Sequence, residues 1–470
     1  MPTPPALPRL AVILAAGKGT RMKSARPKVL HEAGGRPLLG WVLAAARAAG
    51  CERIAVVVGH GAEAVRAAFP DEGIFWVEQR EQLGTGHALA QAEAAVCGGA
   101  SGEALLLVLS GDVPLLSPAT LAGLAAAAET GWGAMATATL PEPGALGRVL
   151  AGADGALARI VEAADATAAE REIRRVNAGI YALRAPAIFD DLRRLRPDNA
   201  KGELYLTDAL GLAAADGRRI ALLDLPEPAE AWGVNDRADL AKAESWLAAR
   251  KAGELMASGV TLLAPERTRI DADVEIGTDT VLHADVTLAG ATRIGRGCTL
   301  HQGAWLRDTA VGDGTVVEPY SVLDGARVGA GCRVGPFGRL RPGTVLEDGA
   351  RVGNFVEVKN STLGRGAKAN HLAYLGDATV GERANLGAGV VTCNYDGHEK
   401  HRTEIGAGAF VGSDTMLVAP VSIGEEATTA AGSVITKDVP AGALAVERSA
   451  QRTYPGWADR RRRTARTGKE

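Results

Sequence analysis

The sequence is poor in aromatic residues and carries no large excess of either charge. Phenylalanine, tryptophan and tyrosine make up 4% of its 470 residues, too few for the aromatic platforms on which nucleic-acid bases stack. Lysine and arginine number 52 and aspartate and glutamate number 55, so the formal net charge is −3. A chain this close to neutrality has no overall basic field for nucleic acid or an anionic membrane. We therefore expect no nucleic-acid partner.

Paired cysteines and long apolar runs are also absent. The five cysteines are odd in number and no two have the Cys-x-x-Cys spacing, so we expect neither a disulfide framework nor a structural zinc site. Unpaired cysteines suit a reducing compartment, which predicts a cytoplasmic protein. The longest apolar runs, such as Leu105–Leu109, are far shorter than the roughly 20 residues of a membrane helix. We therefore expect no membrane insertion.

The first half of the chain, residues 1–237, alternates between two kinds of segment. Short apolar runs lie at 10–14, 54–58 and 104–109, and alanine-rich stretches of helical length lie at 38–49, 87–96 and 118–128. Strands that alternate with helices predict a Rossmann-like α/β domain with a mainly parallel sheet. Residues 238–258 are rich in alanine, leucine, glutamate, lysine and arginine. This composition predicts one long amphipathic helix that connects the domain to the next.

From about residue 262 a six-residue period replaces this pattern. Aliphatic residues stand six apart in several series, the first of which is Ile276, Leu282, Leu288, Ile294, Leu300 and Leu306. A period of six fits neither a helix nor an alternating strand, and it predicts a parallel β-helix over residues 259–470. A small residue usually follows the aliphatic one, as in Ile294-Gly295 and Val411-Gly412, and we expect these glycines to allow tight corners with positive φ. The flat faces of such a β-helix are left uncovered by other elements, so we expect it to pack as a homotrimer.

Two segments interrupt the six-residue period, at 360–379 and 393–403. A loop inserted into an otherwise regular solenoid is often a binding feature. We therefore predict functional loops at both places.

The first predicted strand runs into a glycine-rich, positively charged segment. It reads Leu14-Ala-Ala-Gly-Lys-Gly-Thr-Arg-Met22 and is followed by Pro27-Lys28, which matches neither the dinucleotide-binding fingerprint nor the Walker A loop. Glycines let backbone N–H groups approach an anion, and Lys18, Arg21 and Lys28 add positive charge. The segment therefore predicts a phosphate cradle.

Another predicted strand ends at Ser110-Gly111-Asp112. Ligands of parallel α/β sheets bind at the carboxyl ends of the strands, and a carboxylate beside bound phosphates suits Mg²⁺. A turn or cap role is the alternative for Asp112, but the neighbouring cradle favours a metal site.

Together these motifs resemble those of the sugar-nucleotide pyrophosphorylases. The joined hexapeptide β-helix narrows the resemblance to the bacterial bifunctional N-acetylglucosamine-1-phosphate uridyltransferase/glucosamine-1-phosphate acetyltransferases, over about Arg9 to Trp457. The resemblance implies a left-handed β-helix and Mg²⁺ bound by Asp112 and Asn235, although Asn235 alone would be interpreted as a helix N-cap. It also implies that UTP and UDP-N-acetylglucosamine are bound by Leu14, Ala15, Ala16, Gly17, Lys28, Gln79, Gly84, Thr85, Ser110, Gly111, Asp112, Gly147, Glu162, Asn177 and Asn235.

The implied reaction is an in-line phosphoryl transfer. An oxygen of N-acetylglucosamine-1-phosphate attacks the α-phosphorus of UTP and pyrophosphate leaves, so catalysis is positioning and charge neutralisation. Lys28 and Mg²⁺ would offset charge at the α-phosphate, and Arg21 would hold the pyrophosphate. The chain departs from the family at Ser110, where tyrosine is common, and at Ala163 and Ala164, which replace a polar pair. We expect altered sugar contacts and an intact reaction.

Charged residues and a histidine interrupt the apolar pattern of the second half. Arg341 and Lys359 fall in adjacent predicted coils, and Tyr374 follows His371 closely. A histidine titrates near neutrality and can take a proton from an amine, while Arg341, Lys359 and Tyr374 suit a sugar phosphate. Glu357 is placed to orient the amine or the histidine. Alone, His371 would be interpreted as a solvated loop residue, and these neighbours favour a site instead.

By the same resemblance, His371 is the general base of an acetyl transfer from acetyl-CoA. Glucosamine-1-phosphate is then bound by Arg341, Lys359, Tyr374 and Asn385, and acetyl-CoA by Ala388, Asn394, Tyr395, Ser413, Ala431 and Arg448. A route through an acylated Cys393 is the alternative, but no base is visibly paired with this cysteine. Ala373 replaces a commoner threonine. The basic tail Arg460–Arg463 is interpreted as a solvated, disordered end or as a contact for CoA phosphates or anionic surfaces.

The favoured hypothesis is a two-site enzyme that makes UDP-N-acetylglucosamine for bacterial envelope polymers. One alternative keeps the nucleotidyltransferase domain and makes the β-helix a non-catalytic platform for oligomerisation or allostery. A scaffold does not need a set such as His371, Lys359 and Tyr374, which favours two sites. A purely structural protein would leave the phosphate cradle unexplained.

Overall fold

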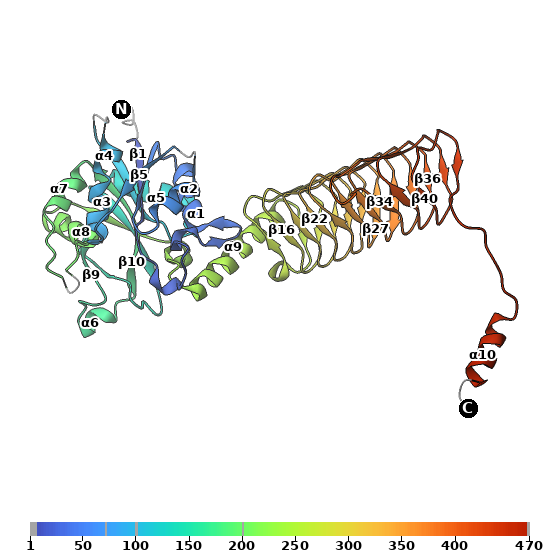
Figure 1. Cartoon of the computed structure of the whole chain (residues 1–470). Coiled ribbons are helices and arrows are strands. Elements are labelled where there is room, and N and C mark those ends of the chain that lie inside the picture. The colour runs from blue at the N-terminus through green and yellow to red at the C-terminus, as the bar shows by residue number, and fades with distance from the viewer. Residues whose placement is uncertain (1–6, 71–72, 99–101, 200–201, 468–470) are drawn as a thin grey trace. The chain divides into compact units, whose positions relative to one another are not determined.

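The computed structural model describes residues 7–70, 73–98, 102–199 and 202–467 (Figure 1). The chain divides into two compact units, residues 1–250 and residues 251–470. Within the described ranges, no helix is both long enough and apolar enough to cross a membrane.

A twisted sheet forms the centre of the first unit. Its strands lie in the order β11 (Ile220–Asp224), β7 (Gly133–Thr139), β10 (Arg175–Ala185), β6 (Ala104–Ser110), β1 (Arg9–Ala15), β4 (Arg53–Val58) and β5 (Ile74–Glu78). Neighbouring strands are parallel except at β10, which is antiparallel to β6 and to β7. β8 (Arg148–Ala151) and β9 (Leu157–Val161) form an antiparallel hairpin that joins the sheet through β10. The predicted mainly parallel α/β sheet is thus confirmed.

Helices cover both faces of this sheet (Figure 1). One face carries α1 (Leu38–Ala48), α2 (Ala62–Ala67) and α5 (Pro118–Glu129), and the other carries α3 (Thr85–Gln91), α4 (Glu93–Cys97), α7 (Ala187–Arg193) and α8 (Leu206–Ala215). Along β1, Ala11 and Ile13 pack on the first face and Leu10 and Val12 on the second, as the two-residue period of a strand requires. The helix predicted over 87–96 is interrupted at Ala92, between α3 and α4.

Shorter elements complete the first unit. They are η1 (Thr20–Met22), η2 (Lys28–Leu30), β2 (Glu32–Ala33), β3 (Arg36–Pro37), α6 (Ala168–Arg171) and η3 (Pro228–Ala231). The long helix α9 (Arg237–Ala257) contributes to both units. Its residues Ala243 and Leu247 lie in a small core of the first unit, whereas Ala252 and Leu255 belong to the core of the second.

The second unit is a β-helix with three parallel sheets. The first sheet contains β12 (Thr261–Leu262), β15 (Val281–Leu282), β18 (Thr299–Leu300), β21 (Val316–Val317), β24 (Arg333–Val334), β27 (Arg351–Asn354), β30 (Lys368–His371), β33 (Asn385–Leu386), β36 (Phe410–Val411), β39 (Thr428–Thr429) and β41 (Leu444–Ala445). The second contains β13 (Arg269–Ile270), β16 (Thr287–Ala289), β19 (Trp305–Arg307), β22 (Val322–Asp324), β25 (Arg339–Leu340), β28 (Glu357–Lys359), β31 (Tyr374–Gly376), β34 (Val391–Cys393), β37 (Met416–Val418) and β40 (Val434–Ile435). The third contains β14 (Glu275–Ile276), β17 (Arg293–Ile294), β20 (Ala310–Val311), β23 (Arg327–Val328), β26 (Val345–Leu346), β29 (Thr362–Leu363), β32 (Ala378–Val380), β35 (Thr403–Ile405) and β38 (Val421–Ile423).

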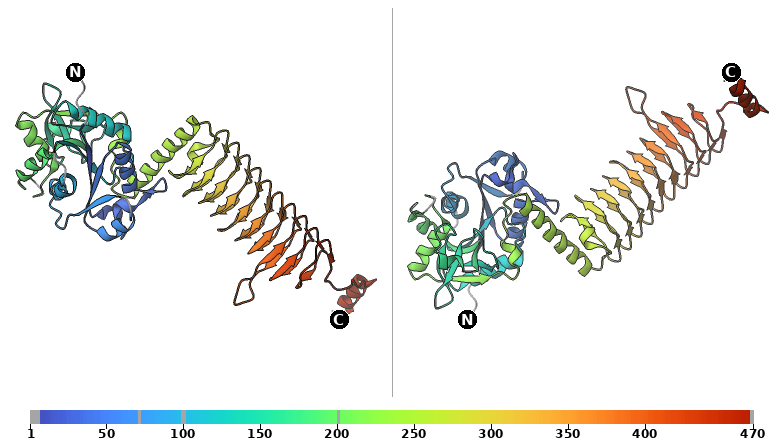
Figure 2. Two further views of the ribbon diagram at one scale, coloured as in Figure 1. Left: turned by 90° about the horizontal axis from the view of Figure 1, so that it is seen from above. Right: turned by 90° about the horizontal axis from the view of Figure 1, so that it is seen from below.

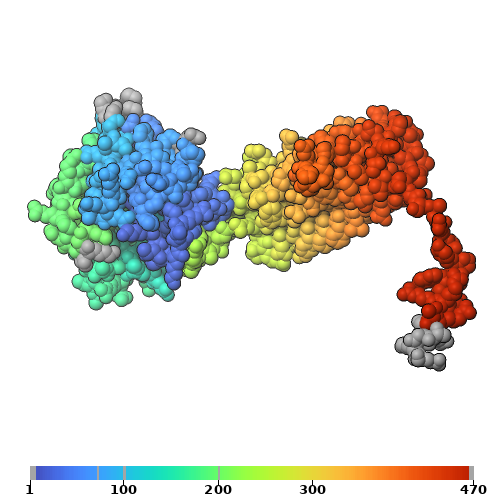
Figure 3. All heavy atoms as spheres, in the orientation of Figure 1, coloured from blue at the N-terminus to red at the C-terminus, as the bar shows by residue number. Residues whose placement is uncertain are grey.

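The six-residue aliphatic series lines the interior of this β-helix. Leu282, Leu288, Leu300 and Leu306 are fully buried, and equivalent residues of successive coils pair directly, as Leu282 does with Leu300. The face of the β-helix that the space-filling view shows has no opening (Figure 3). This architecture confirms the predicted β-helix of hexapeptide repeats, the arrangement expected for the left-handed class.

The glycines that follow the aliphatic residues have a different role from the one predicted. The predicted positive φ is wrong for Gly295 and Gly412, because neither residue has a positive φ. A Cβ atom on Gly295 would lie 2.7 Å from the backbone nitrogen of Asp313, and one on Gly412 would lie 2.6 Å from that of Ala431. These positions are glycine because the next coil approaches too closely for a side chain. The left-handed corner comes two residues later, as at Gly297 with φ of 61°.

One of the two predicted loops is wrong. Strands β29 to β32 run through residues 360–379 in continuous register, and only the coil length changes. Leu340 pairs with Val358 (358 − 340 = 18), whereas Val358 pairs with Leu375 (375 − 358 = 17). The second segment, 393–403, does contain an insertion, closed by a bridge between Tyr395 and Lys400, and it projects from the coils (Figure 2).

The last elements are η4 (Pro265–Arg267), near the start of the second unit, and α10 (Trp457–Thr467). Arg460–Arg463 are exposed, as expected of a solvated end, but they lie within α10, so disorder is wrong for these residues. Arg461 stacks over the Trp457 ring at 5.2 Å, and Arg462 pairs with Asp459 at 3.0 Å.

Candidate active sites

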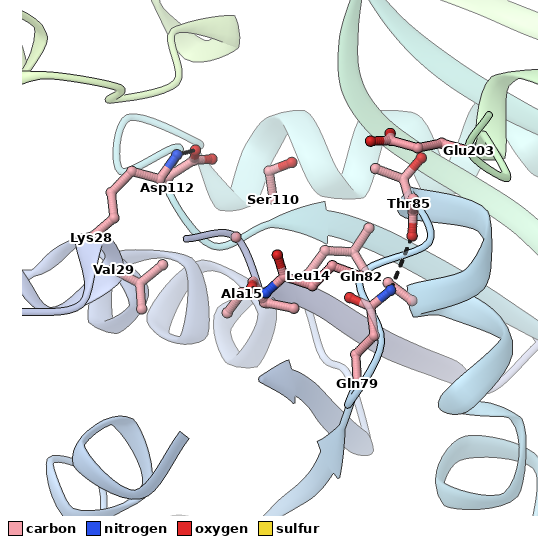
Figure 4. Close-up of a pocket in the computed structure, with 14 residues that line it drawn as sticks. Leu14, Ala15, Lys28, Val29, Gln79, Gln82, Thr85, Ser110, Asp112 and Glu203 are labelled. Atoms are coloured by element: carbon pink, nitrogen blue, oxygen red, sulfur yellow. Dashed lines mark hydrogen bonds and ion pairs between the residues drawn. The ribbon is translucent and has the colours of Figure 1, made fainter. Parts of the chain in front are cut away.

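A cavity of about 300 Å³ opens at the carboxyl ends of β1 and β6 (Figure 4). Its lining includes ten residues predicted to bind the nucleotide: Leu14, Ala15, Ala16, Gly17, Lys28, Gln79, Gly84, Thr85, Ser110 and Asp112. Four further lining residues were not predicted, namely Val29, Gln82, Ala88 and Glu203. Gly111 does not line the cavity, and its N–H donates to the Leu14 carbonyl at 2.9 Å, which ties β6 to the end of β1.

The connection after β5 shapes one wall of this cavity. Gln79 is buried, and its Nε2 donates to the Gly84 carbonyl at 3.1 Å. Gln82 donates to the Ala16 carbonyl at 2.9 Å, so the wall is fastened to the glycine-rich segment. Gln82 lies between Gln79 and Gly84, two nucleotide contacts that the family resemblance implies. The sequence carries no comparable signal for Glu203.

Lys28 and Asp112 form an ion pair at the other end of the cavity (Figure 4). Their side chains are 14% and 19% exposed, so the pair is largely shielded from water yet borders the open space. A shielded cation beside a carboxylate can exchange that partner for an incoming phosphate, because charged hydrogen bonds are strong where water is excluded.

A second cavity, also about 300 Å³, adjoins the first. Both are lined by Leu14, Thr85, Ser110 and Asp112. The second also contains the four predicted sugar contacts Gly147, Glu162, Asn177 and Asn235, together with the unpredicted residues Val113, Ala145, Leu146, Ala178, Gly179, Tyr181, Leu206, Thr207, Ala231 and Gly233. The departure from the family pattern at Ser110 therefore falls where the two cavities meet.

Polar side chains in the second cavity hold one another in fixed orientations. Thr207 Oγ1 donates to Glu162 Oε1 at 3.1 Å, and Asn177 Nδ2 donates to the Tyr181 hydroxyl at 2.7 Å. Asn177 Oδ1 accepts from the Gly179 N–H at 2.9 Å. Burial raises the pKa of Tyr181, so its hydroxyl remains neutral at physiological pH. The cavity thus presents a polar, preorganised wall suited to the hydroxyl and amide groups of a sugar.

Two oxygen donors at this cavity are suited to a divalent cation. Asn235 Oδ1 accepts from Arg21 Nη2 at 2.8 Å, while Asn235 Nδ2 donates to the Gly233 carbonyl at 2.9 Å. The Asn235 amide oxygen therefore faces the cationic group of Arg21, and the Asp112 carboxylate faces that of Lys28. No group of three or more histidine, cysteine, aspartate or glutamate side chains that could hold a metal occurs among the described residues. One carboxylate and one amide oxygen fit Mg²⁺, which usually takes few protein ligands and completes its shell with water and phosphate.

In the β-helix, His371 is the last residue of β30 and pairs with Asn354 of β27. Its Nδ1 lies 2.7 Å from Asn354 Oδ1. An amide oxygen can only accept, so Nδ1 donates this hydrogen bond and Nε2 is the nitrogen left to face a substrate. His371 is exposed, which leaves Nε2 accessible. Asn354 was not predicted, although its position one coil before His371 can be found from the repeat.

Three of the predicted phosphate-binding residues lie along the second sheet. Glu357 accepts from Arg341 Nη1 at 2.9 Å, and Glu357 pairs in register with Tyr374. Lys359 lies at the end of the same strand as Glu357. Asn385 begins β33 in the first sheet, beside Lys368, so it lies on a different face. Glu357 contacts Arg341, and it is Asn354 that orients His371.

The predicted acetyl-CoA residues separate into two groups. Ala388 and Ser413 occupy the same corner of successive coils, because Asp414 N–H donates to the Ala388 carbonyl at 2.7 Å and Gly432 N–H to the Ser413 carbonyl at 2.8 Å. Arg448 extends this row by donating to the Ala431 carbonyl at 3.0 Å. The second group, Asn394 and Tyr395, lies at the inserted loop, where Asn394 is buried and Tyr395 is exposed.

The residues that line the two cavities of the first unit form one constellation, and the candidate site residues of the β-helix form a second. Comparison with known proteins shows the family to which the chain belongs. The sequence pattern of the MobA-like NTP transferase domain matches residues 11–199. A curated relative named bifunctional protein GlmU, from Alkalilimnicola ehrlichii, is 50% identical over 446 residues, which cover 95% of this chain and 95% of that protein. The chain belongs to the bifunctional GlmU family. Further relatives of the same name come from an Anaeromyxobacter species (50% identical, 97% of this chain, 94% of that protein) and from Pelobacter propionicus (46% identical, 95% and 97%).

Membership of the GlmU family confirms the resemblance found in the sequence. The relatives are named bifunctional, and they match over nearly their whole length and over both units of this chain. The alternative of a single activity with a non-catalytic β-helix is therefore not favoured.

Cys393 and Lys400 also bear on the second constellation of this GlmU family protein. Burial raises the pKa of the Cys393 thiol, which disfavours the thiolate that a covalent acyl transfer needs. Lys400, in the inserted loop, was not predicted. The neighbouring ammonium group of Lys359 lowers the pKa of Lys400, so two cationic groups lie close together beside Tyr374.

Proposed function

We propose that this protein is a bifunctional enzyme that makes UDP-N-acetylglucosamine. It transfers an acetyl group from acetyl-CoA to glucosamine-1-phosphate, and then a uridylyl group from UTP to N-acetylglucosamine-1-phosphate. The observation that carries the proposal is the presence of two separate constellations, one per unit, in a chain of the bifunctional GlmU family. The product would supply cell-wall and other envelope polymers. All five cysteines are free, which supports a reducing cytoplasm as its location.

We assign uridylyl transfer to residues 1–237 and acetyl transfer to residues 259–470, linked by residues 238–258. The first assignment is supported by the paired cavities beside β1 and β6. The second is supported by paired strands β28 and β31, which carry Lys359 and Tyr374, by the contact of Arg341 with Glu357 of β28, and by His371, which the register of the first sheet places beside Asn354.

In uridylyl transfer, a phosphate oxygen of N-acetylglucosamine-1-phosphate attacks the α-phosphorus of UTP. The bond from the α-phosphorus to its bridging oxygen breaks, and pyrophosphate leaves with that electron pair. The first cavity would hold the nucleotide and the second the sugar, since they meet at Ser110 and Asp112. Lys28 would leave Asp112 to bind phosphate oxygen, and Arg21 would hold the departing pyrophosphate. Such fixed charges stabilise a transition state without a covalent intermediate.

The cation proposed for this site is Mg²⁺, with Asp112 and Asn235 as its protein ligands. When bound, it would neutralise phosphate charge and help fix the line of attack. Arg21 and Lys28, which now face these two oxygens, would then be released toward the phosphates.

In acetyl transfer, the amine of glucosamine-1-phosphate attacks the thioester carbonyl of acetyl-CoA. His371 Nε2 accepts the proton that the amine loses, because Nδ1 is committed to Asn354. The carbon–sulfur bond then breaks, the CoA sulfur takes the electron pair and a proton, and the amide product forms. Arg341, Lys359, Tyr374 and Asn385 would bind the sugar phosphate. Ala388, Asn394, Tyr395, Ser413, Ala431 and Arg448 would bind acetyl-CoA.

We also propose that the protein assembles as a homotrimer through the β-helix. Tyr320, Phe337 and Phe355 stack at one corner of three successive coils, with ring centroids 5.6 and 5.2 Å apart. These three rings, which we name the aromatic ladder, are 50%, 47% and 57% exposed. Each stands at a positive φ, a conformation that bulky residues rarely adopt. An exposed apolar row of this kind is typical of a surface covered by a partner.

Selective loss of each activity tests the two-site proposal. The protein is incubated with glucosamine-1-phosphate, acetyl-CoA, UTP and Mg²⁺, while free CoA thiol and pyrophosphate are followed separately. His371→Ala should lower acetyl transfer by about 10²–10⁴-fold, the usual contribution of a general base, and spare uridylyl transfer from supplied N-acetylglucosamine-1-phosphate. Lys28→Ala should lower uridylyl transfer and spare acetyl transfer. Equal loss of both activities in either variant would contradict the assignment of separate sites.

A further inference from the structure

A row of short polar residues runs up one corner of the β-helix, beside the strands that carry Lys359 and Tyr374. Asn360, Asp377 and Asn394 follow strands β28, β31 and β34, so they stack in three successive coils. Asn360 Nδ2 donates to Asp377 Oδ1 at 2.6 Å, and Asn394 Nδ2 donates to Asp377 Oδ2 at 2.5 Å. Each carboxylate oxygen of Asp377 is therefore held by an amide from a different coil.

Asp377 is a buried charge in this row. It is 7% exposed and stands at φ of 51°, a left-handed corner that aspartate tolerates better than most residues. Burial acts to raise the pKa of Asp377, but the two amide hydrogen bonds and the positive charges of Lys359 and Lys400 outweigh it, so the pKa is lowered. The carboxylate is therefore ionised, and it offsets the repulsion between the two lysines.

The residue before Asp377 leaves room for the groups around it. A Cβ atom on Gly376 would lie 2.5 Å from the Tyr374 hydroxyl and 2.8 Å from Asn394 Nδ2. Both groups therefore occupy the space that any side chain at position 376 would need. The Asn394 amide, held from behind by Asp377, thus reaches the same notch as Tyr374.

Asn394 also anchors the inserted loop. Its carbonyl accepts from His401 N–H at 2.9 Å, and Thr403 N–H donates to the Asp377 carbonyl at 3.2 Å. Asp377 therefore contacts both ends of the insertion, through its side chain at Asn394 and through its backbone at Thr403.

We infer that Asp377 is a positioning residue of the acetyl-transfer site. It fixes the Asn394 amide and the base of the inserted loop, so that the acyl-CoA thioester meets the phosphorylated amino sugar held near Lys359. The inference rests on the acetyl transfer proposed above for the second unit. Asp377 does not touch either substrate, because its carboxylate is enclosed by two amides.

Asp377→Asn tests this inference, because it keeps the size of the side chain but removes the charge and one acceptor. An amide at this position must turn its NH₂ toward one of the two donating amides. We expect KM for acetyl-CoA to rise about tenfold, with a smaller change in kcat and with unchanged uridylyl transfer in the same protein. Asp308→Asn is the matched control: Asp308 stands four coils earlier at the same corner, at φ of 48°, and both activities should remain at the wild-type level.

A double-mutant cycle with Asn394→Ala separates positioning from a general effect on folding. If Asp377 acts through Asn394, the two changes together should cost little more than Asn394→Ala alone. Full additivity, or a wild-type KM for acetyl-CoA in Asp377→Asn, would overturn the inference. Asn360→Ala removes the other amide partner and should raise KM clearly less than Asp377→Asn; equal effects would show a merely structural role. Absence of CoA release by the wild-type protein would instead refute the proposed acetyl transfer itself.

Discussion

At the residue scale, the coil-to-coil register of the β-helix delivers the partners of each reactive side chain. Asn354 and His371 are 17 residues apart and become neighbours because the coil between them takes 17 residues. The same spacing joins Asn360 to Asp377 and Asp377 to Asn394. Side chains in adjacent coils therefore act as pairs although they are distant in the sequence.

The Asn354–His371 pair makes a prediction at this scale. Asn354→Ala leaves the imidazole free to rotate and to exchange tautomers, so acetyl transfer should fall about fivefold, the worth of one hydrogen bond of about 1 kcal/mol. Asn354→Asp retains an acceptor for Nδ1–H, so it should restore activity. Steady-state rates of CoA release measure both effects. A wild-type rate in Asn354→Ala would show that Asn354 does not position the base.

At the element scale, glycines allow backbone segments to approach where the sites need them. Gly84 is the N-cap residue of α3, with φ of 106° and ψ of 178°, a region that is essentially open only to glycine. A Cβ atom there would lie 2.6 Å from the Leu204 carbonyl oxygen. The connection between β5 and α3 therefore packs directly on the segment that carries Glu203, and together they form one wall of the nucleotide cavity.

Gly84→Ala should disrupt this wall. The substitution imposes backbone strain of about 1–3 kcal/mol and moves Leu204 away, so we expect the efficiency of uridylyl transfer to fall at least tenfold, mainly through KM for UTP. Acetyl transfer should not change. Gly211→Ala is the matched control, since Gly211 lies within α8 with no atom within 4 Å of the new Cβ. That variant should keep both activities and gain about 0.5–1 kcal/mol in stability to urea. Normal UTP kinetics in Gly84→Ala would contradict this account of the wall.

At the scale of the whole molecule, each unit has its own core and its own candidate site. The sheet of the first unit is buried by helices on both faces. The β-helix instead closes its core by stacking coils and leaves its outer corners exposed, including the aromatic ladder. The proposed assembly therefore concerns the second unit, and loss of that assembly should leave uridylyl transfer unaffected.

The aromatic ladder makes the prediction at this scale. Phe337→Glu combined with Phe355→Glu places two charges in a row that the proposed partner would cover, so sedimentation should change from a trimer to a smaller species. Phe75→Glu, a 43% exposed phenylalanine of the first unit, is the control and should leave the trimer intact. An unchanged sedimentation coefficient in the double variant would exclude the ladder from the interface.

Much of this protein could be predicted from the sequence because its signals are local. The glycine-rich segment after β1 predicted a cradle, and ten predicted residues do line one cavity. Glu203 and Thr207 could not be predicted, because α8 and the segment before it reach the cavities only through packing. The positive φ expected at Gly295 was wrong for a related reason: the constraint on Gly295 comes from Asp313 in the next coil.

The two units follow from local sequence, since strand–helix alternation and a six-residue period are properties of neighbouring residues. The chemical groups available at each site follow from the sequence as well. Which of these groups meet depends on tertiary packing. This packing paired Lys28 with Asp112, Arg21 with Asn235 and His371 with Asn354. It also enclosed Asp377 between two amides, because close packing and coil stacking fix distances that no local pattern records.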